Sequence, residues 1–214
     1  MAFDSDLPHR AACRSTAAMD PARERILIVV GNPGTASLDL SLAEAYGEGA
    51  RESGAEVREL RLSALHFDPI LHEGHHGVQE LEPDLRAAQE SILWANHLVI
   101  VYPIGWGSVP ALLKGFIDRT LNSGFAYRYH DDGPLWDKLL RGRSARLITT
   151  SDAPGWWIRF AYRNSDVAMM KHAVLEFCGV TPVRVTRFTR TRHRSDSERG
   201  EWIARARALG ERCA

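Results

Sequence analysis

Short uninterrupted hydrophobic runs alternate along the chain with longer stretches in which hydrophobic residues recur every three or four positions. Runs such as Ile26 to Val30, which lack any polar alternation, are typical of strands buried on both faces of a parallel sheet. Residues 56–62 alternate between polar and apolar, which predicts a more exposed strand near one edge of the sheet. The pattern predicts strands at residues 25–30, 56–62, 98–101, 144–150 and 181–188, and helices at residues 38–54, 83–93, 109–121, 164–177 and 195–210.

This alternation of strands and helices predicts the fold class and the domain organisation. Strands that alternate with helices form βαβ units, so we expect an α/β protein with a doubly wound parallel sheet. A chain of 214 residues is long enough for one well-buried domain, and no linker-like stretch divides it. We expect one domain at residues 25–214, preceded by a flexible tail at residues 1–24 in which translation could start at Met19.

Composition and charge argue against several classes of protein. Hydrophobic residues make up 44% of the chain and charged residues 25%, which is ordinary for a globular protein. Lys and Arg together number 27, as do Asp and Glu, so the net charge gives no indication of nucleic-acid binding. No apolar run approaches the roughly 18 residues of a membrane span. The three cysteines form no C-x-x-C pair, which predicts no disulfide framework and fits a reducing cytoplasm.

Two clusters of polar side chains have a simple structural explanation. His72, Glu73, His75 and His76 could hold a metal ion, but no fourth ligand follows at the spacing of a metal site, so we expect no metal. The arginines within residues 184–194 could recognise a phosphate group, although such a run is more often a solvated face.

Three predicted loops share one location, immediately after buried strands, at residues 31–37, 102–108 and 149–157. Because the carboxyl ends of parallel strands meet at one edge of a sheet, we expect these loops to converge where such folds bind small molecules. The first loop offers hydroxyls and backbone amides to an anion, although Ser37 could simply cap the following helix.

The second of these loops holds Trp106 between two glycines, an arrangement suited to stacking against a flat ring. Pro110 suits the first turn of the helix that follows, and Ser108 is placed to cap it. The three loops together predict a site for a planar cofactor.

Residues 122–134 concentrate aromatic and imidazole side chains outside the predicted helices, among them Tyr127, Tyr129 and His130. Such side chains suit a subunit contact or the wall of a pocket for flat substrates. The alternative is a hairpin-like excursion that packs on its own domain.

Three segments of the chain resemble one known family. The runs YPIGWGSVPALLKGFIDRTLNSGFAYRY, GPLWDKLLRGRSARLITTSD and LEFCGV are similar to the flavodoxin-like NAD(P)H:quinone oxidoreductases, which include DT-diaphorase, bacterial modulators of drug activity and ancillary subunits of potassium efflux systems. The resemblance extends from about Ile26 to about Val185. It implies a five-stranded sheet of order 2-1-3-4-5 with helices on both faces, a flavin at the strand ends, and a homodimer with active sites at the subunit interface.

The resemblance also implies roles for individual residues. The flavin phosphate and ribityl chain would lie against Asn32, Ser37, Leu38 and Asp39. The isoalloxazine ring would lie along Pro103, Ile104, Gly105, Trp106 and Gly107, and its pyrimidine edge near Thr149, Thr150, Ser151 and Asp152. Tyr127 and Tyr129 match tyrosines that reach over the flavin of the partner subunit, where they would contact the substrate.

Several positions depart from the family pattern. Asn32 replaces a histidine that is usual at the phosphate; an amide can still donate a hydrogen bond but carries no charge. Trp157 and Arg163, with Tyr162 adjacent, occupy the positions of a tyrosine and a histidine that stabilise charge on the reduced flavin, and these three residues are the catalytic candidates. A phenol is absent from the first position, but Arg163 could neutralise that charge directly. In the third loop, Ser151 and Asp152 occupy positions where the family has glycines.

The resemblance implies an enzyme in which NAD(P)H reduces the flavin and leaves, after which a quinone or similar aromatic acceptor enters the same slot and takes two electrons. FMN is the expected flavin because no adenine-binding signature is visible, with FAD as the alternative. NADH and NADPH both stay open as the co-substrate. The functional alternatives are a flavodoxin-type electron carrier, a regulatory subunit of a potassium efflux transporter, and a reductase of nitroaromatic or azo compounds.

Overall fold

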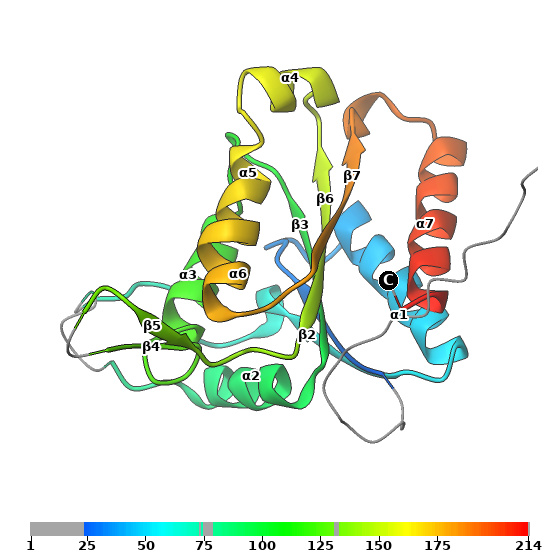
Figure 1. Ribbon diagram of the computed structural model, residues 1–214. Coiled ribbons are helices and arrows are strands. Elements are labelled where there is room, and N and C mark those ends of the chain that lie inside the picture. The colour runs from blue at the N-terminus through cyan, green and yellow to red at the C-terminus, as the bar shows by residue number, and fades with distance from the viewer. Residues whose placement is uncertain (1–23, 73, 75–78, 131–132, 214) are drawn as a thin grey trace, which may run out of the picture.

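The computed structural model describes residues 24–72, 74, 79–130 and 133–213 of the chain (Figure 1). The predicted N-terminal tail lies almost wholly outside these residues, as do Glu73, His75 and His76 of the predicted histidine cluster. Within the described ranges, no three or more His, Cys, Asp or Glu side chains are grouped so that they could hold a metal ion. The helices in that part of the chain include none with the length and apolar character needed to cross a membrane.

Five parallel strands form the central sheet in the order β2-β1-β3-β6-β7. They are β1 (Arg25–Val30), β2 (Glu56–Arg61), β3 (His97–Pro103), β6 (Ser144–Ser151) and β7 (Val183–Thr189). A five-stranded parallel sheet was expected, and the structure confirms it. The numbering differs from the implied order 2-1-3-4-5 because β4 (Tyr127–Tyr129) and β5 (Trp136–Lys138) pair as a separate two-stranded sheet.

Helices cover both faces of this sheet (Figure 1). One face carries α1 (Leu38–Glu52) and α7 (Asp196–Glu211). The other carries α2 (Pro83–Trp94), α3 (Ala111–Thr120), α5 (Ser165–Ala168), a π-helical segment (Met169–Leu175) and α6 (Glu176–Cys178). Helix α4 (Gly155–Phe160) lies beyond the carboxyl end of β6, at the top of Figure 1. Short 3₁₀ helices follow β2 at Leu62–Ala64 and β7 at Thr191–His193.

The side chains of β1 show how the sheet divides the core in two. Ile26, Ile28 and Val30 belong to the cluster under α1 and α7, whereas Leu27 and Val29 belong to the cluster under α2 and α3. A strand with both faces buried therefore has no polar alternation, as the sequence pattern indicates. Strand β2 alternates in exposure and lies at one edge of the sheet, which confirms that prediction.

Local boundaries differ from the predictions at three places. The predicted cap of α3 by Ser108 is wrong: the helix begins at Ala111, directly after Pro110, and no side chain caps it. The backbone of Ser108 instead pairs with Gly105, which holds it in a separate turn. Residues 155–157, expected in the third loop, lie instead in α4. The predicted helix at 164–177 is present, but its middle is a π-helix, with wider turns than an α-helix. Sequence periodicity does not show this change.

Helices α1 and α7 cross in direct backbone contact. A Cβ added at Gly210 would collide with the carbonyl oxygen of Tyr46, and one added at Gly49 would collide with the carbonyl oxygen of Arg207. Glycine is required at both positions because any side chain would force the two helices apart.

The crossing predicts that Gly210→Ala lowers the free energy of unfolding by about 1–3 kcal/mol, because the added methyl group must displace backbone. Gly200→Ala in the same helix is the matched control, since a Cβ there would meet nothing within 4 Å. It should leave stability unchanged or raise it by up to ~1 kcal/mol through helix propensity. Urea denaturation measures both, and equal effects of the two substitutions would contradict the close crossing.

Candidate functional site

The loop after β1 is closed by hydrogen bonds to and from Asn32. Its Oδ1 accepts from the backbone N–H of Gly34 at 2.8 Å, and its Nδ2 donates to Oδ2 of Asp39 at 2.7 Å. The hydroxyl oxygen of Ser37 accepts from the N–H of Leu40 at 3.2 Å and so caps α1. The capping role that competes with anion binding at Ser37 is therefore present.

Asp39 joins this loop to the end of β6. Asp39 is only 3% exposed, and its Oδ1 accepts a hydrogen bond from the hydroxyl of Thr150 at 2.8 Å. Burial raises the pKa of Asp39, while the hydrogen bonds from Asn32 and Thr150 oppose that rise. Two predicted site residues from separate loops, Asn32 and Thr150, thus donate to the carboxylate of a third, Asp39.

The turn after β3 presents Trp106 to solvent. Two backbone hydrogen bonds between Gly105 and Ser108, at 2.9 and 3.1 Å, close the turn. Trp106 and Gly107 have left-handed φ angles of 53° and 73°, and the tryptophan is 101% exposed. A bulky side chain held in this uncommon conformation without packing has no evident role in folding. Its ring is free to stack against a flat ligand.

The segment between α4 and α5 is fastened to this turn. The hydroxyl of Ser165 donates to the carbonyl oxygen of Gly107 at 2.8 Å, and the ring of Tyr162 lies where a Cβ on Gly107 would come within 3.2 Å of it. Arg163 and Asn164 have left-handed φ angles of 50° and 55°, a conformation that two adjacent non-glycine residues rarely share. The predicted catalytic candidates Tyr162 and Arg163 therefore lie beside the Trp106 turn.

Trp157, the third catalytic candidate, lies on α4 close to the same segment. Its ring meets that of Tyr162 edge to face, with 6.4 Å between ring centroids. An indole offers only an N–H donor and cannot replace a phenol as a proton carrier. Trp157 can therefore shape the site but cannot relay a proton.

The four predicted residues at the end of β6 divide between the core and the surface. Thr149, Thr150 and Ser151 are buried, and the carbonyl oxygen of Thr150 accepts from the N–H of Ile104 at 2.8 Å, which ties the second loop to the third. Asp152 turns outward and accepts from the hydroxyl of Thr191 at 2.5 Å and the N–H of Arg192 at 2.9 Å. The hydrogen bond from Thr191 is the main cause of a lowered pKa at Asp152.

A shallow surface pocket adjoins the start of α1. It is lined by Leu38, Asp152, Thr191, Arg192 and Arg199. The sequence predictions include Leu38 and Asp152 as site residues, but they do not bring the start of α7 to the same place. The only signal for it is the arginine-rich run, for which phosphate recognition is the less favoured interpretation. The pocket adds two arginines to the edge where the flavin phosphate is expected.

A row of mostly buried polar side chains lies where the second and third predicted loops begin. Sequence reasoning places Thr149 at the site but misses its neighbours Tyr102, Asp166 and Arg187. Tyr102, Thr149 and Arg187 are register neighbours on β3, β6 and β7, and Asp166 of α5 faces the row, with its Oδ1 3.6 Å from Nη2 of Arg187. Among the described residues, the hydroxyls of Tyr102 and Thr149 and both carboxylate oxygens of Asp166 have no hydrogen-bond partner. Burial is the main cause of a raised pKa at Tyr102, and the nearby Asp166 raises it further.

Tyr127 and Tyr129 are not brought to the other site residues within one chain. They lie on the β4–β5 hairpin, at the end of the molecule away from α4 (Figure 1). Tyr127 packs edge to face on Phe177, with 5.1 Å between ring centroids. Within one chain, this contact agrees with the alternative prediction of a hairpin that packs on its own domain. Tyr129 is 56% exposed.

Three loops meet at the carboxyl edge of this sheet, where they are joined by Asp39 and by the Ser165–Gly107 contact. This edge, at the topological switch point, is where doubly wound α/β proteins bind their ligands. The chain belongs to the family described as having a flavodoxin-like fold, which it matches over residues 24–209.

The chain is also similar to individual proteins, in sequence and in structure. The chain is 28% identical over 184 residues to NAD(P)H dehydrogenase (quinone) 1 of Rattus norvegicus, an alignment that covers 74% of this chain and 66% of the rat protein. It thus spans just under two thirds of that relative's length. The NAD(P)H:quinone oxidoreductase from Methanothermobacter marburgensis superposes with a TM-score of 0.76 at 23% identity, over 90% of this chain and all of the other.

A second solved structure shares the fold and contains a bound flavin. It is an FMN-dependent NADH-azoreductase from Bacillus anthracis in complex with FMN, with a TM-score of 0.66 at 20% identity, over 89% of this chain and 99% of the other. At identities of this size, both solved structures support the fold of the chain.

The burial of Asp39 predicts an unusual dependence of stability on pH. Its pKa is raised in the folded protein, above an unfolded value of about 3.9, so the folded state binds the extra proton. Stability from this group is present at low pH and is lost as the pH rises from about 4 through the folded pKa. Between pH 4 and pH 7, the free energy of unfolding of wild type should therefore fall relative to that of Asp39→Asn.

Asp152→Asn is the control with the opposite sign. The pKa of Asp152 is lowered on folding, so its contribution is present above about pH 4 and is lost as the pH falls below that value. Urea denaturation from about pH 2 to pH 7 covers both transitions and measures both differences. A change of the same sign for the two variants would contradict the assigned environments.

Proposed function

We propose that this protein is a flavin-dependent NAD(P)H oxidoreductase that reduces quinones or similar small aromatic acceptors by two-electron, ping-pong hydride transfer. The observation that carries the proposal is the fully exposed Trp106, held in a left-handed turn at the carboxyl edge of the sheet. The quinone dehydrogenase and oxidoreductase activities named for the relatives support the same class of reaction.

The residues present fit a flavin. The turn from Pro103 to Gly107 offers an exposed indole and close backbone for the ring, and the end of β6 offers hydroxyls and amides for the polar edge of the ring. At the start of α1, free backbone amides and the helix dipole suit the phosphate. Asn32 and Asp39 would act there as a support, because their side chains already bind each other.

We infer FMN as the cofactor, consistent with the FMN bound to the related azoreductase. FAD is the alternative, and one feature favours it. The pocket beside Leu38 presents Arg192 and Arg199, cations that suit a further phosphate group, which FAD has and FMN lacks. Mass identification of the flavin released on denaturation separates the two.

A bound flavin would supply the hydride chemistry. The chain's own contribution is position and charge: Trp106 and Trp157 would shape a slot for flat substrates, and Tyr162 would keep the turn at Gly107 in place. Arg163 would place a permanent positive charge where negative charge develops during electron transfer. One slot used in turn by NAD(P)H and the acceptor gives a ping-pong cycle.

We infer that the protein is a homodimer in the cytoplasm. Tyr127 and Tyr129 lie far from the carboxyl edge of their own sheet (Figure 1), so they would contact substrate only at the site of a partner subunit. The half-exposed ring of Tyr129 is available for such a contact. A regulatory subunit of a potassium efflux transporter and a flavodoxin-type electron carrier are the alternative functions.

The proposal is tested by the absorption spectrum of the purified protein, by titration with FMN and FAD, and by turnover of NADH and NADPH with menadione. We expect a bound flavin and parallel double-reciprocal plots. Intersecting plots would contradict a slot shared by NAD(P)H and the acceptor. An electron carrier, by contrast, would show almost no turnover without a partner protein. A protein that binds neither flavin would overturn the proposal.

Trp106→Ala should weaken FMN binding by roughly tenfold, because stacking of aromatic rings contributes about 1 kcal/mol or more. Fluorescence titration of FMN measures the dissociation constant. Tyr129→Phe is the matched control: it should retain FMN and change only the rate with the acceptor. Unchanged FMN affinity in Trp106→Ala would contradict the stacking role.

A further inference from the structure

The arginine-rich run at residues 184–194 contains arginines with different surroundings. Arg187, Arg192 and Arg194 each pair with a carboxylate. Arg184, near the amino end of β7, is exposed and forms no ion pair with any residue that the structure describes. Its charge therefore has no partner of the kind that the other three arginines have.

Arg184 lies directly beside a second arginine in the sheet. It is the register partner of Arg146 on β6, so the two side chains leave the same face. That face carries α1 and α7, because Ile148 and Phe188, at even spacing along the same strands, belong to its core cluster. Arg146 is buried and donates from Nη1 to Oγ1 of Thr186 at 2.6 Å. Two like charges in this position repel each other unless an anion lies between them.

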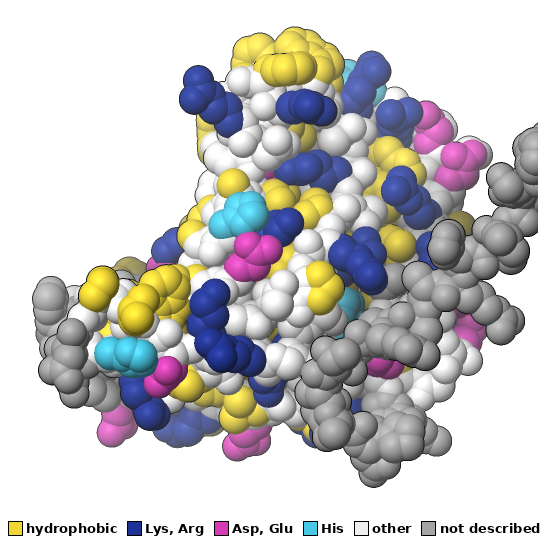
Figure 2. Space-filling model, in the orientation of Figure 1, with side chains coloured by type: hydrophobic (Ala, Val, Ile, Leu, Met, Phe, Trp, Pro, Cys, Tyr) yellow, Lys and Arg dark blue, Asp and Glu magenta, His cyan; other side chains and the backbone are white. Residues whose placement is uncertain are grey.

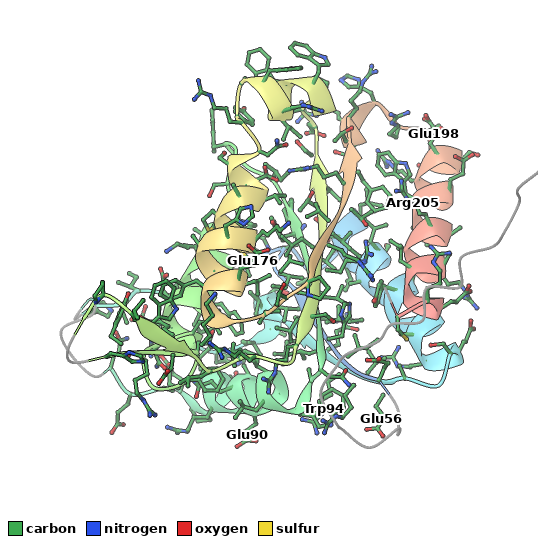
Figure 3. The ribbon with its side chains drawn as sticks, viewed as in Figure 1. Glu56, Glu90, Trp94, Glu176, Glu198 and Arg205 are labelled. Carbon is green, nitrogen blue, oxygen red and sulfur yellow. The ribbon has the colours of Figure 1, made fainter. Side chains whose placement is uncertain are left out.

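Helix α7 brings two further arginines to the same face. The guanidinium carbon of Arg205 lies 5.7 Å from the ring centre of Phe188 on β7, and Figure 3 shows Arg205 on the side of α7 that faces this strand. Arg212 follows seven residues later, which is two helical turns and therefore the same side of the helix. Both residues are exposed.

Arg146, Arg184, Arg205 and Arg212 are defined here as the basic cluster. Burial is the main cause of a lowered pKa at Arg146; Tyr46 opposes this effect, and the other three arginines add to it. Each of the three therefore lies within electrostatic range of Arg146. Figure 2 shows Lys and Arg side chains, in dark blue, over the surface between β7 and α7.

The carboxylates near the basic cluster are engaged or placed elsewhere. Arg207 binds three of them, namely Glu48, Glu52 and Glu211. Glu201 lies one turn before Arg205, but in the described part of the chain Arg205 has no ion pair, and neither has Arg212. Glu24, which precedes β1, is separated from β7 by β3 and β6. The positive charge of the three exposed arginines is therefore not balanced by ion pairs among the described residues.

A buried histidine on the same face points to a ligand. His97 of β3 is 4% exposed, and its Nδ1 lies 2.7 Å from Oγ of Ser144. Its Nε2 has no hydrogen-bond partner among the described residues. Burial lowers the pKa of His97 to about 4, with smaller contributions from Arg146 and Arg184, so the ring is neutral at pH 7. With the hydroxyl of Ser144 donating to Nδ1, Nε2 carries a hydrogen and lacks an acceptor.

We propose that the basic cluster and His97 bind a phosphate group, either free phosphate or the phosphate ester of a small metabolite. Guanidinium groups donate paired hydrogen bonds in a geometry that matches phosphate oxygens. Nε2 of His97 would donate to a further oxygen. The anion would also reduce the repulsion between Arg146 and Arg184, so its binding should stabilise the folded protein.

This site is separate from the proposed flavin site. The three loops and the start of α1 lie at the carboxyl ends of the strands, whereas the basic cluster lies near the amino ends of β6 and β7. Arg184 is five residues before the last residue of β7, about 16 Å along the strand. Phosphate binding here is therefore independent of the proposed oxidoreductase function.

The test is calorimetric titration of the full-length protein with inorganic phosphate at constant ionic strength, with and without saturating FMN. FMN would fill the phosphate position at the start of α1, so binding that persists in FMN belongs to the basic cluster. We expect it to persist. Loss of phosphate binding in FMN, or equal effects of chloride and phosphate, would overturn the proposal.

Titration with glycerol 3-phosphate under the same conditions distinguishes the two sources of the phosphate group. Tighter binding of the ester would identify a phosphorylated metabolite, and tighter binding of inorganic phosphate would identify the free anion. A protein that binds neither would overturn the proposal.

Arg184→Gln should weaken phosphate binding about tenfold, because a charge-assisted hydrogen bond is lost. In phosphate-free buffer the same substitution should raise the urea midpoint, since it removes a like charge beside Arg146. Arg86→Gln on α2 is the matched control, because Arg86 is also exposed and has no ion pair with a described residue. Equal phosphate affinity in the two variants would contradict the site.

Two substitutions of His97 test its Nε2. His97→Gln retains a nitrogen near the position of Nε2 and should bind phosphate as wild type does. His97→Asn retains one near Nδ1, beside Ser144, and should bind phosphate about fivefold more weakly. Thermal denaturation checks that both variants are folded. The reverse order of affinities would contradict the role of Nε2.

FMN titration of Arg184→Gln keeps this result separate from the proposed function. Arg184 is not part of the flavin site, so the variant should bind FMN as wild type does. A wild-type protein that binds phosphate but no flavin would refute only the catalytic proposal, whereas one that binds flavin but no phosphate would refute only the phosphate site.

Discussion

The buried carboxylate of Asp39 constrains the whole carboxyl edge of the sheet. One of its oxygens accepts from Asn32, in the loop after β1, and the other from Thr150, at the end of β6. A buried carboxylate is costly unless its oxygens are satisfied, so each loop must stay where it can donate. Strand β3 lies between the two, which leaves its turn and Trp106 framed on both sides. The candidate site thus depends on one acidic group that itself faces away from solvent.

A second contact extends that frame to the segment between α4 and α5. Ser165 donates to the carbonyl oxygen of Gly107, and left-handed residues lie on both sides of the contact: Trp106 and Gly107 in the turn, Arg163 and Asn164 in the segment. Such conformations persist only where surrounding structure holds them. Here each strained segment supports the other. The aromatic and cationic side chains at this edge therefore owe their positions to backbone conformations that the rest of the fold compensates.

Hydrophobic periodicity was sufficient to predict the five strands of the main sheet and the long helices, because burial on both faces of a sheet leaves an unmistakable apolar run such as Ile26 to Val30. It could not predict α4 or β5, which have six and three residues and are too short to show a period. The convergence of the three loops followed from parallel topology alone. The partners of Asp39, the contact of Arg192 with Asp152, and the row that includes Arg187 and Asp166 depend on long-range packing, and no local signal in the sequence marks them.

The row formed by Tyr102, Thr149, Arg187 and Asp166 has a consequence for which substitutions this end of the molecule tolerates. Among the described residues, the hydroxyls of Tyr102 and Thr149 and both carboxylate oxygens of Asp166 have no hydrogen-bond partner. The guanidinium of Arg187 lies 3.6 Å from Oδ1 of Asp166. Removing one member of a buried charge pair costs more free energy than exchanging both for apolar residues of similar volume, because the remaining charge stays buried and unpaired. Arg187 on β7 and Asp166 on α5 therefore form one unit: the two can be replaced together, but not one at a time.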